Sequence, residues 1–491
     1  MKRALALTPA DRDFFHRFDN FVFSNPFSEQ RAQLLDTLVP SMSTAALQKD
    51  RHALSAVVAR RLEAFDRDQP SRLTDFSGED RQLVEAAHLY LTYHRFLDDL
   101  DRLLERQLES DTSVELWFAE DVYACMGQRG FSDDAIARYL SFFYQLRRAF
   151  HFIDRSLPGD SPSMRRLRLS LWDNTFTHDM HNFNQCLWNR MEDFSTLLIG
   201  ETGTGKGSAA MAIGRSSYIP YAPARRCFAE NFTKTFIAIN LSQFPETLIE
   251  SELFGHRKGA FTGAIQDHKG VFERCSAHGA LFLDEIGEVS APVQIKLLQV
   301  LQERTFSSLG SHAPNRFKGR VIGATNRSLA ELRAAGRFRD DLFYRLCSDV
   351  IIVPPLRIRL QERPGELEQL VSILVERMLG EPSPTLTDQA VSALERDLPK
   401  PYTWPGNVRE LEQAVRQILL TGRFHASPGK HVSTPDDDFL AAVQAGTLSA
   451  DELVSRYCAL LHRRYPTYVD VAKRTGLDRR TVRKHLSPLG S

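Results

Sequence analysis

Leu198-Ile199-Gly200-Glu201-Thr202-Gly203-Thr204-Gly205-Lys206 is the stretch that decides the fold of this chain of 491 residues. The apolar run Thr196–Ile199 predicts a buried strand before the loop, and Ala209–Ile213 predicts a helix behind it. The glycines permit positive φ, which turns backbone N–H groups inward, and the start of a helix favours an anion. This arrangement is typical of a phosphate-binding loop, in which Lys206 reaches the β- and γ-phosphates of a nucleotide.

The residue after the lysine departs from that pattern. Gly207 stands where a Ser or Thr usually supplies a hydroxyl to Mg²⁺, so the metal must be placed by another residue. A glycine-rich turn beside an incidental lysine is the alternative interpretation. The strand before the loop and the helix after it disfavour that alternative.

Two further predicted strands end in residues suited to nucleotide chemistry. Gly279–Glu285 is apolar until Asp284 and Glu285, and the carboxyl end of such a strand borders a nucleotide crevice. We expect Asp284 to hold Mg²⁺ and Glu285 to polarise the attacking water. The strand Arg320–Asn326 ends in an amide suited to sensing the γ-phosphate, although a plain strand-end Asn that opens a turn is the alternative for Asn326.

The order of elements predicts the fold class. Strands and helices alternate from about residue 170 to 360, which indicates a largely parallel sheet with helices on both faces. Residues 1–160 have helical apolar spacing and no catalytic constellation, and residues 361–425 are also predicted to be helical. Pro158–Ser163 and residues 426–448 have the composition of linkers.

Composition excludes several classes of protein. The net charge is zero and the pI is about 7.3, so the chain as a whole has no basic field toward nucleic acid. Six scattered cysteines without a C-x-x-C pair favour reduced thiols. We find neither a signal peptide nor an apolar run of about 18 residues. We therefore expect a cytoplasmic protein that does not bind membranes.

The end of the chain is locally basic. Residues 451–491 hold nine Lys and Arg against four Asp and Glu. Helices are predicted over 468–475 and 479–486, and Ala472, Gly476 and Val482 have the spacing of a helix-turn-helix. A basic, solvated helical hairpin is the alternative. We expect double-stranded DNA to be the partner, contacted by the exposed residues of the second helix, which are Arg479, Arg480, Thr481, Arg483 and Lys484.

The most specific motif is Gly259-Ala260-Phe261-Thr262-Gly263-Ala264. Through it the chain resembles the AAA+ ATPases that activate the sigma-54 form of bacterial RNA polymerase, and the resemblance extends from about residue 176 to 422. Two glycines bracket a Phe-Thr tip, and an exposed Phe on a loop is unfavourable unless a partner covers it. The resemblance implies that residues 259–264 contact sigma-54.

The resemblance also assigns roles around the nucleotide. Residues 200–206 resemble the Walker A loop of the family, in which the next residue is typically Glu, so Gly207 departs from this pattern as well. Asp284 and Glu285 resemble its Walker B pair. Asn240 corresponds to an Asn that restrains the catalytic glutamate, and Arg409 corresponds to a second sensor in a helical lid over residues 361–425.

Two arginines match residues that the family supplies from a neighbouring subunit. Arg339 and Arg345 correspond to arginine fingers, which stabilise transition-state charge and imply a homo-oligomeric ring, by resemblance a hexamer. A surface ion pair is the alternative for either arginine. Ser216–Lys234 is longer than the corresponding segment of most members, and we interpret it as a surface insertion.

Together these features predict a multidomain activator. It would have a helical N-terminal regulatory domain, an α/β AAA+ ATPase with a helical lid, and a C-terminal helix-turn-helix. It would bind upstream DNA through 449–491 and hydrolyse ATP to remodel the sigma-54 polymerase closed complex. An AAA+ remodeller of another protein, with the basic end as an adaptor, is the alternative, and the intact hexapeptide disfavours it. An N-terminal enzyme with an appended ATPase is a second alternative, which lacks a catalytic constellation.

Overall fold

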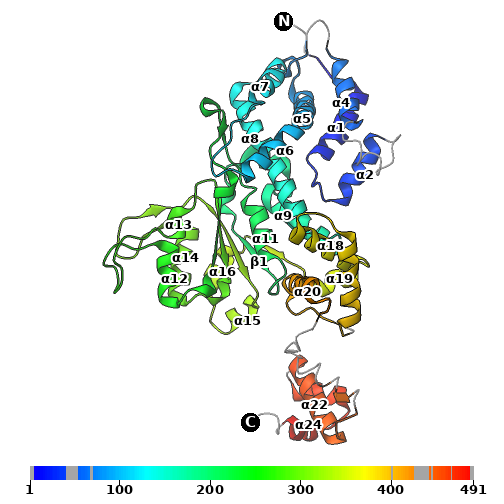
Figure 1. Ribbon diagram of the computed structural model, residues 1–491, viewed down its shortest axis with the longest axis vertical. Coiled ribbons are helices and arrows are strands. Elements are labelled where there is room, and N and C mark those ends of the chain that lie inside the picture. Colours follow the sequence, from blue (N-terminus) through cyan, green and yellow to red (C-terminus); the bar gives the residue numbers. More distant parts are fainter. Residues whose placement is uncertain are drawn as a thin grey trace. The chain divides into compact units, whose positions relative to one another are not determined.

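A computed structural model describes residues 5–39, 53–66, 70–399, 402–424, 439, 442–443, 446–465 and 467–486. The chain falls into two compact units, Met1–Phe424 and His425–Ser491. Figure 1 labels the elements of both units.

A five-stranded parallel sheet forms the centre of the first unit, with the strand order β4-β5-β8-β1-β9. Its strands are β1 (Thr196–Ile199), β4 (Phe236–Asn240), β5 (Ala280–Asp284), β8 (Arg320–Thr325) and β9 (Asp349–Ile352). The predicted parallel sheet is confirmed. The strands predicted from the sequence do not include β9, although Val350, Ile351 and Ile352 are apolar; it is an edge strand that buries only one of its four residues.

The two faces of the sheet belong to different hydrophobic cores, because successive side chains of a strand point to opposite sides. Leu198 and Phe282 pack with helices α9 and α11, whereas Leu197 and Leu281 pack with α12, α14 and α16. The helices of this part are α9 (Pro162–Phe176), α11 (Lys206–Gly214), α12 (Glu246–Phe254), α13 (Val271–Arg274), α14 (Ala291–Glu303), α15 (Leu329–Ala334) and α16 (Asp340–Leu346). Helices therefore cover both faces, as predicted.

The N-terminal part of the first unit is helical. Its helices are α1 (Pro9–Val22), α2 (Glu29–Leu38), α4 (Ala53–Glu63), α5 (Gly78–Arg95), α6 (Leu97–Leu108), α7 (Ala119–Gln128) and α8 (Asp133–Arg155). The buried side chains of Phe15 and Phe18 belong to the same core as Leu198 and Phe282 of the sheet. Because this core continues from the helices into the sheet, the boundary expected near residue 160 does not separate two compact units.

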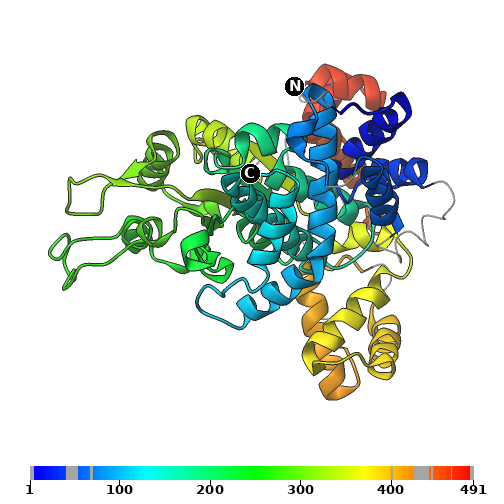
Figure 2. The same cartoon turned by 90° about the horizontal axis from the view of Figure 1, so that it is seen from above.

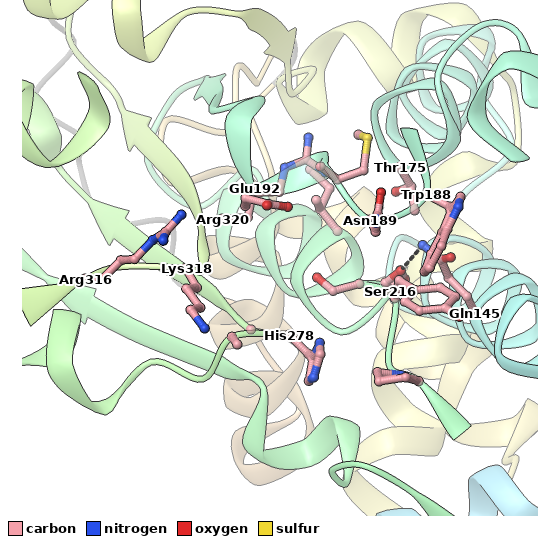
Figure 3. Close-up of a pocket in the computed structure, with 17 residues that line it drawn as sticks. Gln145, Thr175, Trp188, Asn189, Glu192, Ser216, His278, Arg316, Lys318 and Arg320 are labelled. Carbon is pink, nitrogen blue, oxygen red and sulfur yellow. Dashed lines mark hydrogen bonds between the residues drawn. The ribbon is translucent and has the colours of Figure 1, made fainter. Parts of the chain in front are cut away.

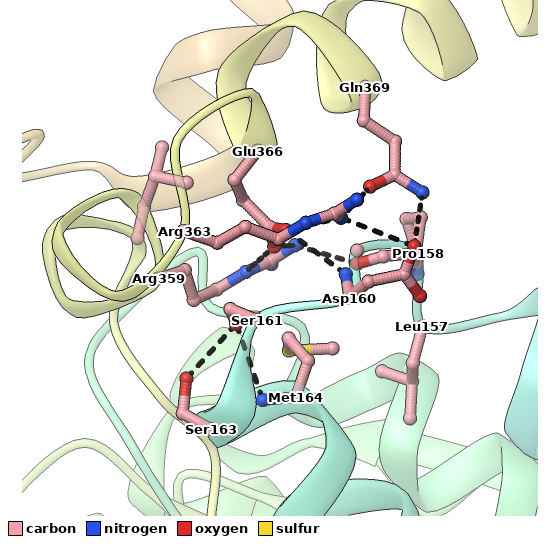
Figure 4. Close-up of polar contacts among 12 residues, drawn as sticks. Leu157, Pro158, Asp160, Ser161, Ser163, Met164, Arg359, Arg363, Glu366 and Gln369 are labelled. Atoms are coloured by element: carbon pink, nitrogen blue, oxygen red, sulfur yellow. Dashed lines mark hydrogen bonds and ion pairs between the residues drawn. The ribbon is translucent and has the colours of Figure 1, made fainter.

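The linker predicted at Pro158–Ser163 is wrong, because this segment is packed against the lid (Figure 4). The guanidinium of Arg359 and the carboxylate of Glu366 lie 2.9 Å apart with side-chain exposures of 3% and 0%. The backbone N–H of Asp160 donates to Glu366 at 3.0 Å. Gly159 has φ 110°, and a Cβ at this position would overlap both charged groups. The turn-forming residues of this segment make a buried contact with the lid instead of forming a flexible linker.

Residues 216–234 are not a surface insertion, because they pack against the N-terminal helices and connect them to the sheet. They contain a two-stranded hairpin, β2 (Tyr221–Ala222) and β3 (Cys227–Phe228), in which the fully buried Phe228 stacks on Tyr144 of α8 at 3.9 Å. The side-chain NH2 of Asn231 lies within hydrogen-bond distance, 2.8 to 3.1 Å, of the carbonyl oxygens of Gln107, Ser110 and Thr112, to which its two N–H groups donate. The extra residues therefore serve the contact with the N-terminal helices.

The lid consists of α17 (Leu356–Glu362), α18 (Glu366–Leu379), α19 (Pro384–Asp397) and α20 (Asn407–Thr421). The helical prediction for residues 361–425 thus agrees with the structure. Among the described residues, no helix is both long and apolar enough to cross a membrane.

The second unit holds three helices in its described residues: α22 (Ala450–Arg464), α23 (Tyr468–Thr475) and α24 (Arg479–Leu486). The two predicted helices lie over the expected residues, whereas α22 precedes the helices that the sequence analysis predicts. Cys458 and Leu461 of α22 form a small core with Val471 and Val482. Most of the linker predicted over residues 426–448 lies outside the described residues.

Candidate functional site

The predicted phosphate loop lies between β1 and α11. Gly205, with φ 104°, caps the helix, and Lys206 is its first residue. The ammonium group of Lys206 donates to the carbonyl oxygens of Gly200 at 2.8 Å and Glu201 at 3.1 Å. Burial lowers the pKa of Lys206, although Glu285 and Asp284 act in the opposite direction. The lysine is therefore held across the loop, close to two carboxylates.

The lid is fixed to the tip of this loop. The N–H of Val408 donates to the carbonyl oxygen of Gly203 at 3.0 Å, and a Cβ on Gly203 would overlap the carbonyl oxygen of Gly406. Glu201 accepts hydrogen bonds from Arg357 at 2.6 and 2.7 Å and from Asn407 at 3.1 Å. Glu201 therefore anchors the lid, a function that sequence reasoning missed.

Asp284 and Glu285 follow each other at the carboxyl end of β5. Asn240 is the register partner of Asp284 on the neighbouring strand β4. The Oδ1 of Asp284 accepts a hydrogen bond from the N–H of Glu285 at 3.0 Å, and Glu285 has φ 57°. Burial raises the pKa of Glu285. The amide oxygen of Asn240 accepts from the N–H of Ser242 at 3.0 Å, so the predicted restraint of Glu285 by Asn240 remains a prediction.

Asn326 joins the end of β8 to both groups. Its side-chain amide donates to the hydroxyl of Thr202 at 2.9 Å, and its N–H donates to Oε2 of Glu285 at 3.4 Å. The predicted sensor is therefore in contact with the phosphate loop and with the predicted base.

One pocket of about 370 Å³ brings most of these residues together. It is lined by the phosphate loop from Thr202 to Gly207, by Asn240, Asp284 and Glu285, and by Arg409 of the lid. Its apolar walls were not predicted, and they come from Leu157, Pro158, Met164, Leu370, Ile373 and Leu374. Leu370 and Leu374 have the i, i+4 spacing of one helix face, which is a signal for a buried stripe but not for a ligand.

The pocket suits a nucleotide and a divalent cation. Loop amides, Lys206 and Arg409 provide positive charge at one end, and apolar side chains provide the wall that a base requires. The carboxylate of Asp284 lines the pocket, and the hydrogen bond from Glu285 engages only its Oδ1. A hard cation such as Mg²⁺ prefers oxygen ligands of this kind.

The two predicted arginine fingers lie outside this pocket. Arg339 is exposed and pairs with Asp341 at 2.6 Å. The Nε of Arg345 donates to the carbonyl oxygen of Leu301 at 2.9 Å. Within one chain these arginines do not reach the nucleotide pocket, and the prediction that they serve a neighbouring subunit stays open.

The predicted contact loop, residues 259–264, lies after α12, and the loop after α14 lies beside it. Figure 2 shows loops of this part extending away from the sheet. The N–H of Gly259 donates to the carbonyl oxygen of Ala264 at 2.8 Å, which closes the loop. Phe261 is 38% exposed and its ring lies 4.9 Å from that of His256. Ile265, which the motif does not include, is 81% exposed, so the apolar tip is larger than predicted.

The predicted DNA-contact residues share helix α24 with a core residue. Arg479, Arg480, Arg483 and Lys484 are exposed, whereas Val482 is buried. Thr481 differs from the expectation, because it is only partly exposed and its hydroxyl donates to Asp478 at 2.5 Å. Asp478 also accepts from the N–H of Arg480 and thereby caps the helix.

A second pocket, of about 510 Å³, lies where residues 216–220 meet the helical region and the sheet. Figure 3 shows Arg316 and Lys318 on one side of it and Gln145 and Trp188 on the other. The side-chain amide of Gln145 donates to the carbonyl oxygen of Ser216 at 3.0 Å. None of its described lining residues belongs to the phosphate loop, so this pocket is separate from the nucleotide pocket.

Comparison with known proteins gives three kinds of match. Residues 176–351 match the family model of the sigma-54 interaction domain. A Nif-specific regulatory protein of Azotobacter vinelandii is 39% identical over 267 residues, which are 53% of this chain and 44% of that protein. The transcriptional regulatory protein ZraR of Klebsiella oxytoca is 37% identical over 338 residues, covering 67% of this chain and 68% of that protein. A crystal structure of NtrX from Brucella abortus in complex with ADP covers 76% of this chain and 81% of that one, with 22% identity and a TM-score of 0.41.

The matches differ in how much of each relative they include. The family model extends from the end of α9 into β9, so helices α1 to α8 and the second unit lie outside it. For the first relatives, this chain spans less than half of the other protein, as the 44% of the Nif-specific regulatory protein shows.

Proposed function

Because the chain belongs to the family of sigma-54-dependent transcriptional activators, we propose that it is an ATP-hydrolysing activator that remodels the sigma-54 RNA polymerase closed complex. The observation that carries this proposal is the single pocket that gathers the phosphate loop, Asp284, Glu285 and Arg409. Family membership supports sigma-54 RNA polymerase as the partner, and the residues of the pocket support ATP hydrolysis as the reaction.

Binding of ATP uses the charged end of the pocket. The backbone N–H groups of residues 202–207 and the start of α11 cradle the phosphates. Lys206 exchanges its hydrogen bonds to the loop carbonyls for bonds to the β- and γ-phosphates. Arg409, on the first turn of α20, adds a second cation from the lid, so ATP joins the lid to the loop.

Hydrolysis uses the carboxylates at the end of β5. Asp284 would hold Mg²⁺, which neutralises phosphate charge when it is bound. Glu285 polarises the attacking water, and its desolvated carboxylate is a stronger base than an ordinary glutamate. Asn326 bonds to both Glu285 and Thr202, so it responds to the state of the γ-phosphate. Asn240, beside Asp284, restrains Glu285 between turnovers.

In a homo-oligomeric ring, which the family membership indicates to be a hexamer, a neighbouring subunit completes each nucleotide site. The Nε of Arg345 is tied to the carbonyl oxygen of Leu301, and the other guanidinium nitrogens have no hydrogen-bond partner in the described part of the chain. These nitrogens are suited to a phosphate of the neighbouring subunit. Arg339 must first leave Asp341 before it can act in the same way. Such a finger is worth about 10³ to 10⁵ in rate.

Two surfaces connect hydrolysis to transcription. The loop of residues 259–264 presents Phe261 to sigma-54, with Ile265 beside it. The exposed cations of α24 bind the phosphates and base edges of upstream double-stranded DNA.

The test measures binding of labelled sigma-54 to the full chain by fluorescence anisotropy. ATP, ADP and ADP with aluminium fluoride, which mimics the transferring phosphoryl group, are compared. We expect a complex in at least one nucleotide state and its loss in Phe261→Ala. ATP turnover without sigma-54 binding in any of these states would favour remodelling of another protein, and absence of turnover would refute the proposal.

A further inference from the structure

The N-terminal helices line a third, partly open pocket, here termed the aromatic cavity. It has a volume of about 340 Å³ and lies among α1, α2, α5, α8 and α9. Its walls are mainly apolar, with aliphatic side chains such as Leu89, Leu97 and Leu146 beside the aromatic side chains of Phe23, Tyr90, Tyr93, Phe142, Phe143, Phe150 and Trp172. A largely apolar, partly open pocket of this size with a few polar groups is typical of small-molecule sites.

Arg31 places an unbalanced positive charge in this cavity. Its Nη1 donates to the carbonyl oxygens of Phe21 at 2.6 Å and Ser24 at 3.1 Å, and its guanidinium lies 4.1 Å from the centre of the Phe21 ring. In the described part of the chain, no carboxylate lies within ion-pairing distance, and Nη2 and Nε have no hydrogen-bond partner. Burial lowers the pKa of Arg31 to about 10, so it remains charged at neutral pH.

The second arginine of the cavity is already neutralised. Arg147 is paired with Asp101 through two hydrogen bonds, one of them 2.7 Å long, and it also bonds to the hydroxyl of Tyr93. Helix α9 contributes a donor to the cavity, because the buried Nε1–H of Trp172 has no acceptor among the described residues. The unsatisfied groups of the cavity are therefore one cation and one N–H donor.

We propose that the aromatic cavity binds a small aromatic carboxylate. The ring would pack among the aromatic walls, where offset and edge-to-face contacts are favourable. The carboxylate would pair with the free side of the Arg31 guanidinium, whose planar fork matches a carboxylate. The half-buried guanidinium of Arg31 has no carboxylate partner, and an anionic ligand would supply one.

Helix α8 connects this cavity to the phosphate loop. Phe143, Arg147 and Phe150 line the cavity from α8. Arg148 of the same helix donates to the carbonyl oxygens of Arg215 at 2.5 Å and Ser217 at 2.7 Å. Arg215 caps α11, the helix that begins with Lys206. Occupation of the cavity is thus transmitted through one rigid helix to α11, and its effect on ATP turnover rests on the proposed function.

Binding is measured by isothermal titration calorimetry on the full chain with benzoate and 2-naphthoate. 2-Naphthamide, the neutral analogue, and octanoate, an acid without a ring, serve as matched comparisons. We expect 2-naphthoate to bind at one site per chain, and both comparisons to bind at least about tenfold more weakly. Equal binding of the amide or of octanoate would overturn the assignment, as would absence of binding by both aromatic acids at about 10 mM.

Two variants locate the site. Arg31→Gln should weaken 2-naphthoate by about 10- to 100-fold. The control is Arg61→Gln, because Arg61 also lies over a phenyl ring, that of Phe14 at 4.2 Å, but is paired with Asp11 outside the cavity. Leu146→Trp fills the cavity and should abolish binding while circular dichroism remains native. Unchanged affinity in either Arg31→Gln or Leu146→Trp would refute the site.

Amide hydrogen exchange distinguishes ligand binding in the aromatic cavity from the effect of that binding on α11. With 2-naphthoate bound, exchange in α11 should change in the wild type and stay constant in Leu146→Trp. Binding without any change in α11 would overturn the connection through α8. Binding with a change in α11, but in a protein that hydrolyses no ATP, would leave the cavity established and refute the proposed function.

Discussion

The side-chain amide of Asn326 donates to the hydroxyl of Thr202 at 2.9 Å. The end of strand β8 is therefore held against the phosphate loop, although 124 positions separate the two residues in sequence. Because Asn326 also contacts Glu285, a shift of the phosphate loop would change the surroundings of Glu285, the proposed base.

Lys206 and Glu285 should separate binding from turnover. Lys206→Ala removes the cation from the loop and should weaken ATP by about 10- to 100-fold, the value of a charged hydrogen bond. Glu285→Gln should keep ATP affinity and lower turnover by about 10²- to 10⁴-fold. Fluorescent-nucleotide titration and phosphate release measure the two quantities. Wild-type turnover in Glu285→Gln would contradict its role as the base.

The pH dependence of turnover should report on Glu285. A base acts when it is ionised, so turnover is present above its pKa and is lost as the pH falls through it. Burial raises this pKa, and the acid limb should therefore lie at higher pH than for an ordinary glutamate. Single-turnover rates measured between about pH 5 and 8 would show the limb. An acid limb at or below the usual pKa of glutamate would contradict this assignment.

Gly207 should tolerate a side chain, whereas Gly203 should not. A Cβ at Gly207 meets no atom within 4 Å, and Ala there should stabilise α11 by up to about 1 kcal/mol. Gly207→Glu should raise ATPase activity by restoring the Glu that the family resemblance implies at this position. Gly203→Ala is the comparison, because its Cβ overlaps the carbonyl oxygen of Gly406. A sharp loss of activity in Gly207→Glu would show that the glycine itself takes part.

The tip of the contact loop should be needed for the partner and not for hydrolysis. Phe261→Ala should retain ATP turnover and weaken sigma-54 by roughly one to two orders of magnitude, because it removes a contact worth about 1.5–3 kcal/mol. Ile265→Ser should have a smaller effect in the same direction, since this exposed side chain extends the apolar tip. If Phe261→Ala lost its ATPase activity in an assay that contains no sigma-54, the loop would belong to the catalytic machinery instead.

The buried pair of Arg359 and Glu366 should be essential for the lid. Glu366→Gln leaves the guanidinium of Arg359 buried without a charged partner and should lower the free energy of unfolding by about 3–5 kcal/mol. Glu368→Gln, at an exposed position on the same helix, is the control and should leave stability unchanged. Thermal unfolding of the first unit provides the measurement. Equal stability of the two variants would contradict the structural role of the pair.

The sequence predicts those parts whose signal is local. The apolar run before Gly200 and the acids after Phe282 are local patterns, and β1, α11 and β5 lie where these patterns place them. The assembly of Asn326, Glu285 and Thr202 follows from parallel strands, whose carboxyl ends meet at one edge.

The remaining features depend on contacts between distant residues. The turn-forming composition of residues 158–163 cannot show that Glu366 will receive the N–H of Asp160. The length of residues 216–234 shows an addition but not its position, which is set by Phe228 on Tyr144 and by Asn231. Glu201 lies inside a phosphate-loop motif, and nothing in this motif predicts its bond to Arg357.

The continuous core of the first unit limits how this chain can be recombined. A gene fusion that replaces residues 1–160 with another module would remove the helices that pack on α9 and α11, the two helices behind one face of the sheet, and would deprive Phe228 of its stacking partner. By contrast, a breakpoint after Phe424 follows the boundary between the compact units. Exchange of the second unit, the proposed DNA-binding part, should therefore be easy, whereas exchange of the N-terminal helices should require the 216–234 segment to be inherited with them.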